Sequence, residues 1–455
     1  MAQYRLKCMH PDCGKIHDVE NDYRLKCAEE LEGKHGPALL RTLYDSKELT
    51  IRDELPGIFK YADWLPVGEN SLNIKQEDLG RPICYKSYGL ADRLDLKHLY
   101  IAFSGYHPLR GANLITRTFK EFECQVSIGR LAHSYQQEGI PPLLICSAGN
   151  TANGFNLMAY LMDFPVYLVV PESGLDKLVL PYETKAKLVA VKGDYSDAID
   201  LSNGLAQATE FVQDGGALNV GRRGGMGAVM LHAVTHPREG LHKLYDHYFQ
   251  AVGSASGAIA AWEACQLLKG DGRFGNTTTH IHMAQNYPFT PIAESWKTGN
   301  RKLRDLPYDD AKKQISSVAA DVLTNRNPPY EMPGGIYDVL TESDGFAWQV
   351  NNYDIFQAAR MFSITEGVDI GPSAAVAVDA LRQAVEAGAV KSDEHVLLHV
   401  TGGGREIQHS ESSTWDVKPI RYVDVGAVDD ALDAFGELQP PTDIDRILVP
   451  YGSNS

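Results

Sequence analysis

Short apolar runs alternate with amphipathic stretches along most of the chain, beginning near Pro82. Continuous apolar runs bounded by polar or glycine-rich segments predict buried strands at 143–147, 165–170, 186–192, 248–252 and 395–400. Spacing typical of helices predicts helices at 150–162, 197–211, 227–233, 258–268 and 373–387. Apolar strands separated by helices are typical of a mainly parallel sheet covered on both faces, so we predict an α/β fold.

Composition excludes some classes of protein. The chain has 455 residues, and 43 Lys+Arg against 59 Asp+Glu give a formal net charge of −16, which disfavours a nucleic-acid partner. No apolar run approaches the roughly 18 residues that a membrane span needs, and the N-terminus has no signal-peptide core. Seven scattered cysteines are typical of free thiols, so we expect a cytoplasmic protein without a membrane partner.

The first segment with candidate chemistry contains Lys120, which follows a polar loop and enters a predicted helix. A buried lysine has a lowered pKa and a more nucleophilic amine, which can form a Schiff base with an aldehyde cofactor. Taken alone, the segment is also compatible with an ordinary surface lysine.

Two further segments each join a predicted strand to a predicted helix. Small residues and exposed amides in Ser147-Ala148-Gly149-Asn150-Thr151 favour a carboxylate, although an ordinary helix N-cap fits too. The glycine-rich segment Gly253-Ser254-Ala255-Ser256-Gly257 favours a phosphate at a helix start, with a plain turn as the alternative. Its glycine spacing does not match the dinucleotide fingerprint, which argues against a nicotinamide-dependent dehydrogenase.

A hydroxyl follows the last predicted strand, where Thr401 precedes three glycines. Thr401 could contact the ring nitrogen of a cofactor, or the segment could be a surface turn. In the order lysine, asparagine loop, glycine loop and hydroxyl, the chain resembles the pyridoxal-phosphate enzymes of fold type II, which include tryptophan synthase β, threonine synthase and cysteine synthase. The resemblance spans residues from about Arg81 to Gly404.

Several segments resemble most the cysteate synthase group of that family. They are YIAFSGYHPLRGAN (100–113), TFKEFEC (118–124), GALNVGRRGGMGAVMLHA (216–233) and HYFQAVGSASGAIAAWEA (247–264). The resemblance implies that O-phospho-L-serine and sulfite give L-cysteate and phosphate in coenzyme M biosynthesis. It leaves open a β-elimination or another β-substitution on a sulfonated or thiol-containing substrate, with a thiol as the second reactant.

The resemblance also implies a role for each segment. Lys120 would hold pyridoxal 5′-phosphate as a Schiff base and act as the base on the substrate. Asn150 would bind the 3′-oxygen and Thr401 the ring nitrogen of the cofactor. The remaining residues would bind the cofactor phosphate (Gly253, Ser254, Ala255, Ser256, Gly257) and the substrate carboxylate (Ser147, Ala148, Gly149, Thr151).

Arginines in the matched segments are candidates for binding two anions, because guanidinium suits bidentate contact with oxyanions. Arg110 and Arg117 flank Lys120 and, with Asn113, are the predicted substrate residues, whereas Arg222 and Arg223 are weaker candidates. The segment from Leu114 to Glu121 lacks the N-P-T-G-S-x-K-D pattern of threonine synthases, which disfavours threonine synthase itself. A regulatory protein that binds the cofactor without turnover is disfavoured because all four segments are present.

The N-terminus is rich in cysteine and hints at a zinc ribbon like that of some threonine synthases. Cys8, Cys13 and Cys27 lack a fourth cysteine, although His10, His17 or His35 could complete a tetrahedral site. The incomplete second pair favours a degenerate ribbon, so we expect no metal.

The expected architecture has two α/β domains with the cofactor in the cleft between them. We expect an N-terminal extension at 1–80, a large domain from 81–130 and 235–455, and a smaller mobile domain at 131–234. By analogy with related enzymes, we expect a homodimer.

Overall fold

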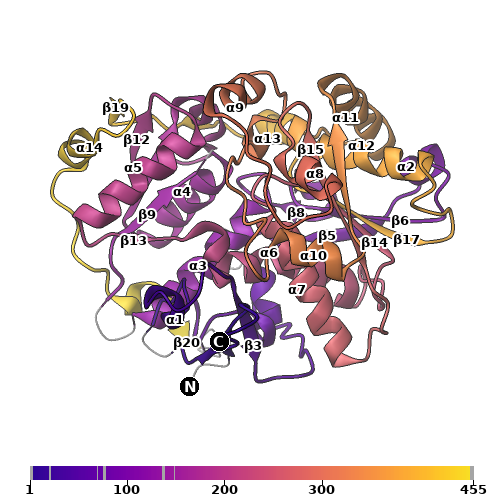
Figure 1. The fold of residues 1–455 in the computed structure, drawn as a ribbon, viewed down its shortest axis with the longest axis horizontal. Coiled ribbons are helices and arrows are strands. Elements are labelled where there is room, and N and C mark those ends of the chain that lie inside the picture. The colour runs from indigo at the N-terminus through magenta and orange to yellow at the C-terminus, as the bar shows by residue number, and fades with distance from the viewer. Residues whose placement is uncertain are drawn as a thin grey trace.

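The computed structural model describes residues 4–19, 22–68, 70–74, 78–135, 139–147 and 149–450. The predicted substrate residue Ala148 therefore lies outside the described residues. Figure 1 shows a smaller sheet with its helices on the left, a larger sheet with its helices on the right, and the N-terminal unit below.

The larger sheet has six strands in the order β16-β15-β14-β17-β6-β5, and all neighbours are parallel except the edge strand β5. Its strands are β5 (Ile83–Lys86), β6 (His98–Phe103), β14 (His247–Ala251), β15 (His280–Asn286), β16 (Phe346–Val350) and β17 (His395–Val400). Alternate side chains enter two different cores, as Leu397 and Leu398 do on β17. Continuous apolar strands therefore produce a sheet buried on both faces, which confirms the predicted fold class.

The smaller sheet is entirely parallel, in the order β13-β9-β10-β12-β19. Its strands are β9 (Leu143–Cys146), β10 (Val166–Pro171), β12 (Lys187–Val191), β13 (Val212–Gln213) and β19 (Arg421–Val423). Helix α4 (Asn150–Met162) packs on one face, and α5 (Tyr195–Ala208) and α14 (Val428–Phe435) pack on the other. The domain prediction assigned residues 235–455 to the large domain, whereas β19 and α14 lie with the smaller sheet.

The N-terminal unit is an antiparallel sheet of β1 (Tyr4–Cys8), β2 (Ile16–His17) and β3 (Leu40–Tyr44). The short helix α1 (Ala28–Leu31) lies between β2 and β3 in the chain. The small core of this unit contacts Val220 of the central helix α6 (Val220–Thr235). Three two-stranded pairs complete the strands: β4 (Asn70–Leu72) with β20 (Leu448–Pro450), β7 (Tyr106–His107) with β8 (Ala112–Asn113), and β11 (Val179–Leu180) with β18 (Trp415–Asp416).

Helix α6 packs against both α3 (Lys120–Ser134) and α7 (Ser256–Asp271), and α3 and α6 lie near the centre of the molecule (Figure 1). The remaining helices are α2 (Gly89–Arg93), α8 (Pro291–Lys297), α9 (Tyr308–Ile315), α10 (Ile336–Glu342), α11 (Asn352–Glu366), α12 (Pro372–Glu386) and α13 (Arg405–Glu411). Among the described residues, no helix is both long and apolar enough to cross a bilayer.

Candidate active site

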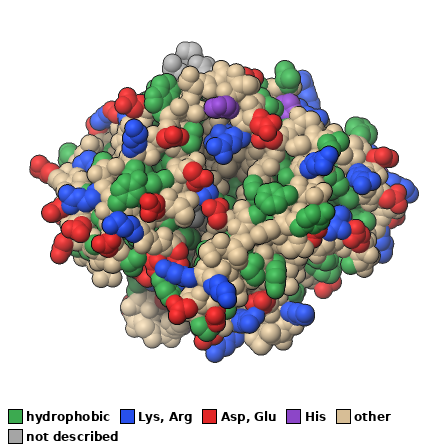
Figure 2. Space-filling model, turned by 90° about the horizontal axis from the view of Figure 1, so that it is seen from above, with side chains coloured by type: hydrophobic (Ala, Val, Ile, Leu, Met, Phe, Trp, Pro, Cys, Tyr) green, Lys and Arg blue, Asp and Glu red, His purple; other side chains and the backbone are tan. Residues whose placement is uncertain are grey.

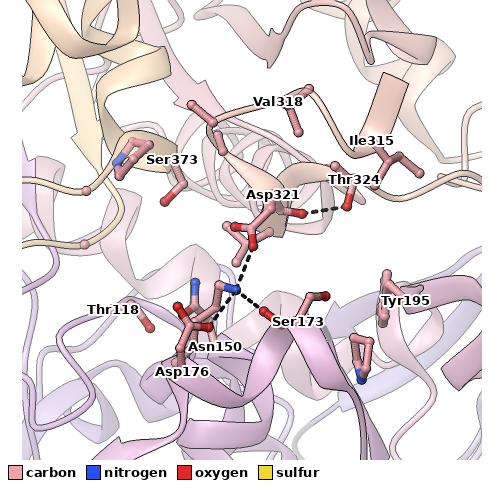
Figure 3. Close-up of a pocket in the computed structure, with 18 of the residues that line it drawn as sticks. Thr118, Asn150, Ser173, Asp176, Tyr195, Ile315, Val318, Asp321, Thr324 and Ser373 are labelled. Atoms are coloured by element: carbon pink, nitrogen blue, oxygen red, sulfur yellow. Dashed lines mark hydrogen bonds and ion pairs between the residues drawn. The ribbon is translucent and has the colours of Figure 1, made fainter. Parts of the chain in front are cut away.

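Two adjoining cavities lie between the sheets. The inner cavity has a volume of about 110 Å³ and the outer one about 1030 Å³. Figure 3 shows Asn150, Ser173 and Tyr195 facing Asp321 and Ser373 across the outer cavity. The two cavities adjoin, because six residues line both of them: Thr118, Asn150, Tyr195, Val322, Ser373 and Gly402.

Lys120 lines the inner cavity as the first residue of α3. An isolated antiparallel bridge joins Thr118 to Gly402, and the Phe119 N–H donates to the Thr401 carbonyl at 3.1 Å. These bonds fix the start of α3 against the end of β17. The predicted lysine and the predicted hydroxyl residue, far apart in the sequence, are thereby brought together.

A buried ionic cluster lies beside Lys120. The Nζ of Lys120 is 3.1 Å from Oε2 of Glu123, whose Oε1 accepts from the Thr151 hydroxyl at 2.5 Å and lies 3.4 Å from Nη1 of Arg222. Arg222 also pairs with Asp214. Burial raises the pKa of Glu123, but Arg222, Lys120 and Thr151 outweigh it and hold that pKa below its ordinary value. Glu123 is therefore ionised and restrains both the lysine and Thr151.

The asparagine loop joins β9 to α4. Gly149 has φ 133°, a conformation that favours glycine, and its N–H donates to the Ser147 hydroxyl at 3.1 Å. This turn places Ser147, Asn150 and Thr151 on the wall of the inner cavity. Their contacts to a cofactor oxygen and to a carboxylate stay predictions.

The glycine loop lies between β14 and the 16-residue helix α7. All five residues from Gly253 to Gly257 line the inner cavity, and Ala255 adopts φ 56°. The first N–H groups of a helix have no partner within it, and the helix dipole favours negative charge there. The loop therefore has the donors that a phosphate requires.

A buried polar network supports the wall of the inner cavity at Gln250. His399 contacts the Ser104 hydroxyl through Nε2 at 3.0 Å and the Tyr248 hydroxyl through Nδ1 at 2.8 Å. The Tyr248 hydroxyl donates its proton to Gln250, a wall residue, so Nδ1 of His399 must donate to Tyr248. Burial lowers the pKa of His399 to about 3, which keeps the ring neutral. Hydrogen bonds among side chains of β14, β17 and Ser104, which directly follows β6, thus fix Gln250.

The predicted anion-binding residues separate into two groups. Arg117, with φ 60°, lines the outer cavity, where burial and the neighbouring Arg405 lower its pKa. Arg110 lies elsewhere, because its guanidinium stacks 4.3 Å from the Tyr85 ring centroid and donates to the Glu366 carbonyl.

Asn113 is in β8 and pairs with Tyr106 in the short β7/β8 ladder. Neither Arg110 nor Asn113 is among the described residues that line the two cavities. Of the weaker candidates, Arg222 lines the inner cavity, whereas Arg223 binds Glu263 and the Leu40 carbonyl.

Sequence reasoning missed other residues of this site. Arg405 lies beside Arg117, Tyr195 lines both cavities, and Glu123 contacts the lysine. Glu123 could have been noticed from its i, i+3 spacing to Lys120 on a predicted helix. The other two depend on tertiary structure and have no local signal.

Comparisons with known proteins agree with this geometry. A family model described as pyridoxal-phosphate dependent enzyme matches residues 85–402. Cysteate synthase from Methanoculleus marisnigri is 43% identical over 427 residues, covering 93% of this chain and 94% of the relative. Cysteate synthase from Methanocorpusculum labreanum is 40% identical and covers 94% of this chain and 99% of the relative.

Solved structures show the same fold. A pyridoxal 5′-phosphate-dependent aspartate racemase has a TM-score of 0.55 at 14% identity and covers 72% of this chain and 91% of its own. Diaminopropionate ammonia lyase from Escherichia coli has a TM-score of 0.54 at 16% identity and covers 72% and 85%.

The chain therefore belongs to the pyridoxal-phosphate-dependent enzymes of fold type II, and it is an enzyme. Within them it belongs to the cysteate synthase family.

Pyridoxal 5′-phosphate is the cofactor, and the described residues fit it. The inner cavity combines an amine, an asparagine, a threonine and a helix N-terminus with a glycine loop. The hydroxyl of Thr118, which lines the same cavity, is buried and has no hydrogen-bond partner among the described residues. A buried polar atom without a partner is uncommon in native proteins, so a polar ligand is expected beside it.

Proposed function

We propose that the chain converts O-phospho-L-serine and sulfite into L-cysteate and phosphate. The β-carbon loses its bond to the phosphate oxygen and gains a bond to the sulfite sulfur, and the α-proton is removed and returned. The observation that carries this proposal is the 43% identity, over nearly the whole chain, to a cysteate synthase. The cavities supply a phosphate loop and a separate pair of arginines in agreement with it.

The bound cofactor would act as an electron sink that acidifies the α-proton and assists departure of the β-substituent. Lys120 would hold the cofactor and carry the α-proton on Nζ. Ser147 and Thr151 would bind the substrate carboxylate, and the bond from Thr151 to Glu123 orients that hydroxyl. Thr401 would contact the ring nitrogen, and Gly253 to Gly257 the cofactor phosphate.

Arg117 is the first candidate for the incoming and departing anions. Its guanidinium has no ion pair or hydrogen bond with another described residue, and Arg405 lies close to it. Two guanidinium groups that face one cavity repel each other, and the charge of the Asp369 carboxylate on the same wall offsets part of that repulsion. A bound anion would offset the rest. Ser373, in the first turn of the 15-residue helix α12, adds a helix N-terminus to the same cavity. These features suit a phosphate or a sulfite in an otherwise acidic protein.

Ion pairs cross the outer cavity and join the two sheets. Lys177, which follows the smaller sheet's β10, contacts Asp321 at 2.8 Å and also Asp176 and the Ser173 carbonyl (Figure 3). Lys312 of α9 and Arg326 bind Asp197 and Asp194 of the smaller domain. We infer that these pairs hold the cleft partly closed and that a mobile smaller domain would break them to admit substrate. Figure 2 shows charges of both signs intermixed on the face seen from above.

The test incubates the protein, loaded with pyridoxal 5′-phosphate, with O-phospho-L-serine and sulfite, and measures cysteate by mass spectrometry and phosphate by colorimetry. Equal amounts of cysteate and phosphate are expected. Lys120→Ala should abolish both, whereas Lys269→Ala, at an exposed position on α7, should not. Phosphate with pyruvate but no cysteate would instead show β-elimination, and cysteine formed from sulfide would show a thiol-type reactant. Threonine formed from O-phosphohomoserine would show threonine synthase.

We also propose a cytoplasmic homodimer that acts in coenzyme M biosynthesis. Exposed apolar side chains support the dimer. On α11, Tyr353, Phe356 and Ile364 are 70%, 56% and 72% exposed. Leu109, whose neighbour Arg110 contacts the end of α11 at Glu366, is 96% exposed. Light scattering should give twice the chain mass, and Ile364→Glu should give the monomer. Cells that lack the gene should need added cysteate or coenzyme M to grow.

A further inference from the structure

Three thiols and one imidazole meet in the N-terminal unit. Cys8 ends β1, Cys13 lies in the turn before β2, Cys27 caps α1, and His35 follows α1. Their four ligand atoms all lie within 4.8 Å of one another. The sequence pattern had favoured a ribbon without metal because a fourth cysteine is missing, but the fold brings His35 into that place.

The distances match those of a tetrahedral metal site. With zinc–sulfur bonds of about 2.3 Å and zinc–nitrogen bonds of about 2.0–2.1 Å, tetrahedral angles separate two sulfurs by about 3.8 Å and a sulfur from a nitrogen by about 3.6 Å. The sulfurs of Cys13 and Cys27 are 3.8 Å apart, and Cys8 Sγ is 3.7 Å from His35 Nε2. A disulfide would need a sulfur separation of about 2.05 Å. All three cysteines are free thiols.

Neighbouring groups orient these ligands as in a metal centre. His35 Nδ1 lies 2.7 Å from the Gly36 carbonyl, which only accepts, so Nδ1 carries the proton and Nε2 presents its lone pair to the cluster. His17 Nε2 lies 3.3 Å from Cys27 Sγ and can donate to a thiolate. The Cys13 N–H donates to the His10 carbonyl at 3.1 Å and closes the turn that presents Cys13.

We propose that Cys8, Cys13, Cys27 and His35 bind one zinc ion. Four protein ligands leave no open coordination position, so the ion is structural and not catalytic. The need for a metal follows from the size of this unit, whose own core is limited to a few side chains such as Tyr4, Leu6 and Val19.

The ion would stabilise a segment that touches the wall of the active site. Between Cys13 and Cys27, the Tyr23 hydroxyl donates to the Asp214 carbonyl at 3.3 Å. The Arg130 guanidinium stacks 4.5 Å from the Tyr23 ring centroid. The Asp214 side chain pairs with Arg222, the partner of Glu123. Loss of zinc should therefore lower thermal stability and loosen this wall.

A second group of side chains is an alternative candidate for the zinc site. His232, His236 and Glu239 also lie close enough to hold an ion. In that group His232 already bonds the Tyr61 hydroxyl and Glu239, each at 2.9 Å, and Arg81 pairs with Glu239. These partners satisfy the group without a metal.

The test is the zinc content of the full-length holoenzyme, measured by plasma mass spectrometry after gel filtration. We expect one zinc ion per chain, lost in Cys13→Ser and His35→Ala and retained in Cys265→Ser, a cysteine outside the cluster. Because the first two variants could fail to fold, the wild-type protein is also loaded with cobalt, which should give tetrahedral ligand-field bands and thiolate charge transfer. Absence of zinc and cobalt after anaerobic reconstitution would overturn the proposal, as would zinc lost in His236→Ala but retained in Cys13→Ser.

Discussion

A substitution at Gly257 tests whether the glycine loop, Gly253 to Gly257, binds the cofactor phosphate. A Cβ built at this position would collide with the side-chain amide of Gln250 and lie 2.9 Å from the Phe119 ring, below the 3.4 Å at which ordinary contact begins. Phe119 directly precedes Lys120, and Gln250 is held by Tyr248. Gly257→Ala must therefore displace the Gln250 amide, the Phe119 ring beside Lys120, the start of α7, or a combination of them.

The magnitude follows from overpacking and from lost hydrogen bonds. Overfilling a packed site costs about 1–3 kcal/mol of the free energy of unfolding. Misplacing one N–H that binds a charged phosphate costs about 1.5–3 kcal/mol of binding free energy, which weakens cofactor affinity by about 10- to 150-fold.

Gly270→Ala is the matched control, because it lies on the same helix with no atom within 4 Å of the added Cβ. It should stabilise the protein by about 0.5–1 kcal/mol, since alanine favours a helix interior over glycine. Cofactor affinity is measured from the visible absorption of the bound cofactor, and stability by urea unfolding. Wild-type affinity and stability in Gly257→Ala would refute the assignment of this loop.

Two further predictions concern pH and anion binding. Burial raises the pKa of Glu121 to about 7 from its ordinary 4.5, so the stability associated with its protonation is present below pH 4.5 and is lost as the pH rises to about 7. Glu121→Gln should therefore reduce the fall in unfolding free energy between pH 5 and pH 8 by about 2–3 kcal/mol in urea titrations, and an unchanged pH dependence would contradict this. Arg117→Gln should raise KM for phosphoserine or sulfite by about 10- to 100-fold in the coupled phosphate assay, and Arg110→Gln should leave both KM values unchanged. The reverse result would move the anion site to Arg110.

The sequence was sufficient to predict those helices and strands whose bounds depend on the local pattern of apolar and polar residues. The helix predicted at 150–162 and the strand at 395–400 have those bounds in the structure, because a polar or glycine turn interrupts the apolar pattern at each boundary. The helix predicted at 227–233 lies mostly in the second half of the longer α6, whose first turns contain glycines and arginines that weaken the apolar periodicity. Local pattern could not place β19 in the smaller sheet, since that pairing joins segments more than two hundred residues apart.

The residues of the candidate site also divide into those with a local sequence signal and those that depend on contacts between distant segments. The asparagine and glycine segments stand at the ends of strands and Lys120 at the start of a helix, where a sequence signal exists, and the structure brings all three into one cavity. The proximity of Arg405 to Arg117 and the stacking of Arg110 on Tyr85 depend on contacts between distant segments. Two arginines that flank a lysine in sequence can therefore point to different parts of the molecule.

The close packing of α3 against α6 explains how a charged cluster can lie buried beside Lys120. A Cβ at Gly225 would overlap the Phe122 carbonyl and lie 3.0 Å from the Cα of Glu123, so only glycine allows the two helices to approach this closely. That approach brings Arg222, three residues earlier on α6, within reach of Glu123. Two cations, Lys120 and Arg222, then face two carboxylates, those of Glu123 and Asp214. An isolated buried charge is strongly destabilising, and removing one partner of a buried pair costs about 3–5 kcal/mol, so the four charges are stable only together. The glycines of α6 thus act on the chemistry indirectly, because their packing allows the ionised Glu123 that restrains Lys120.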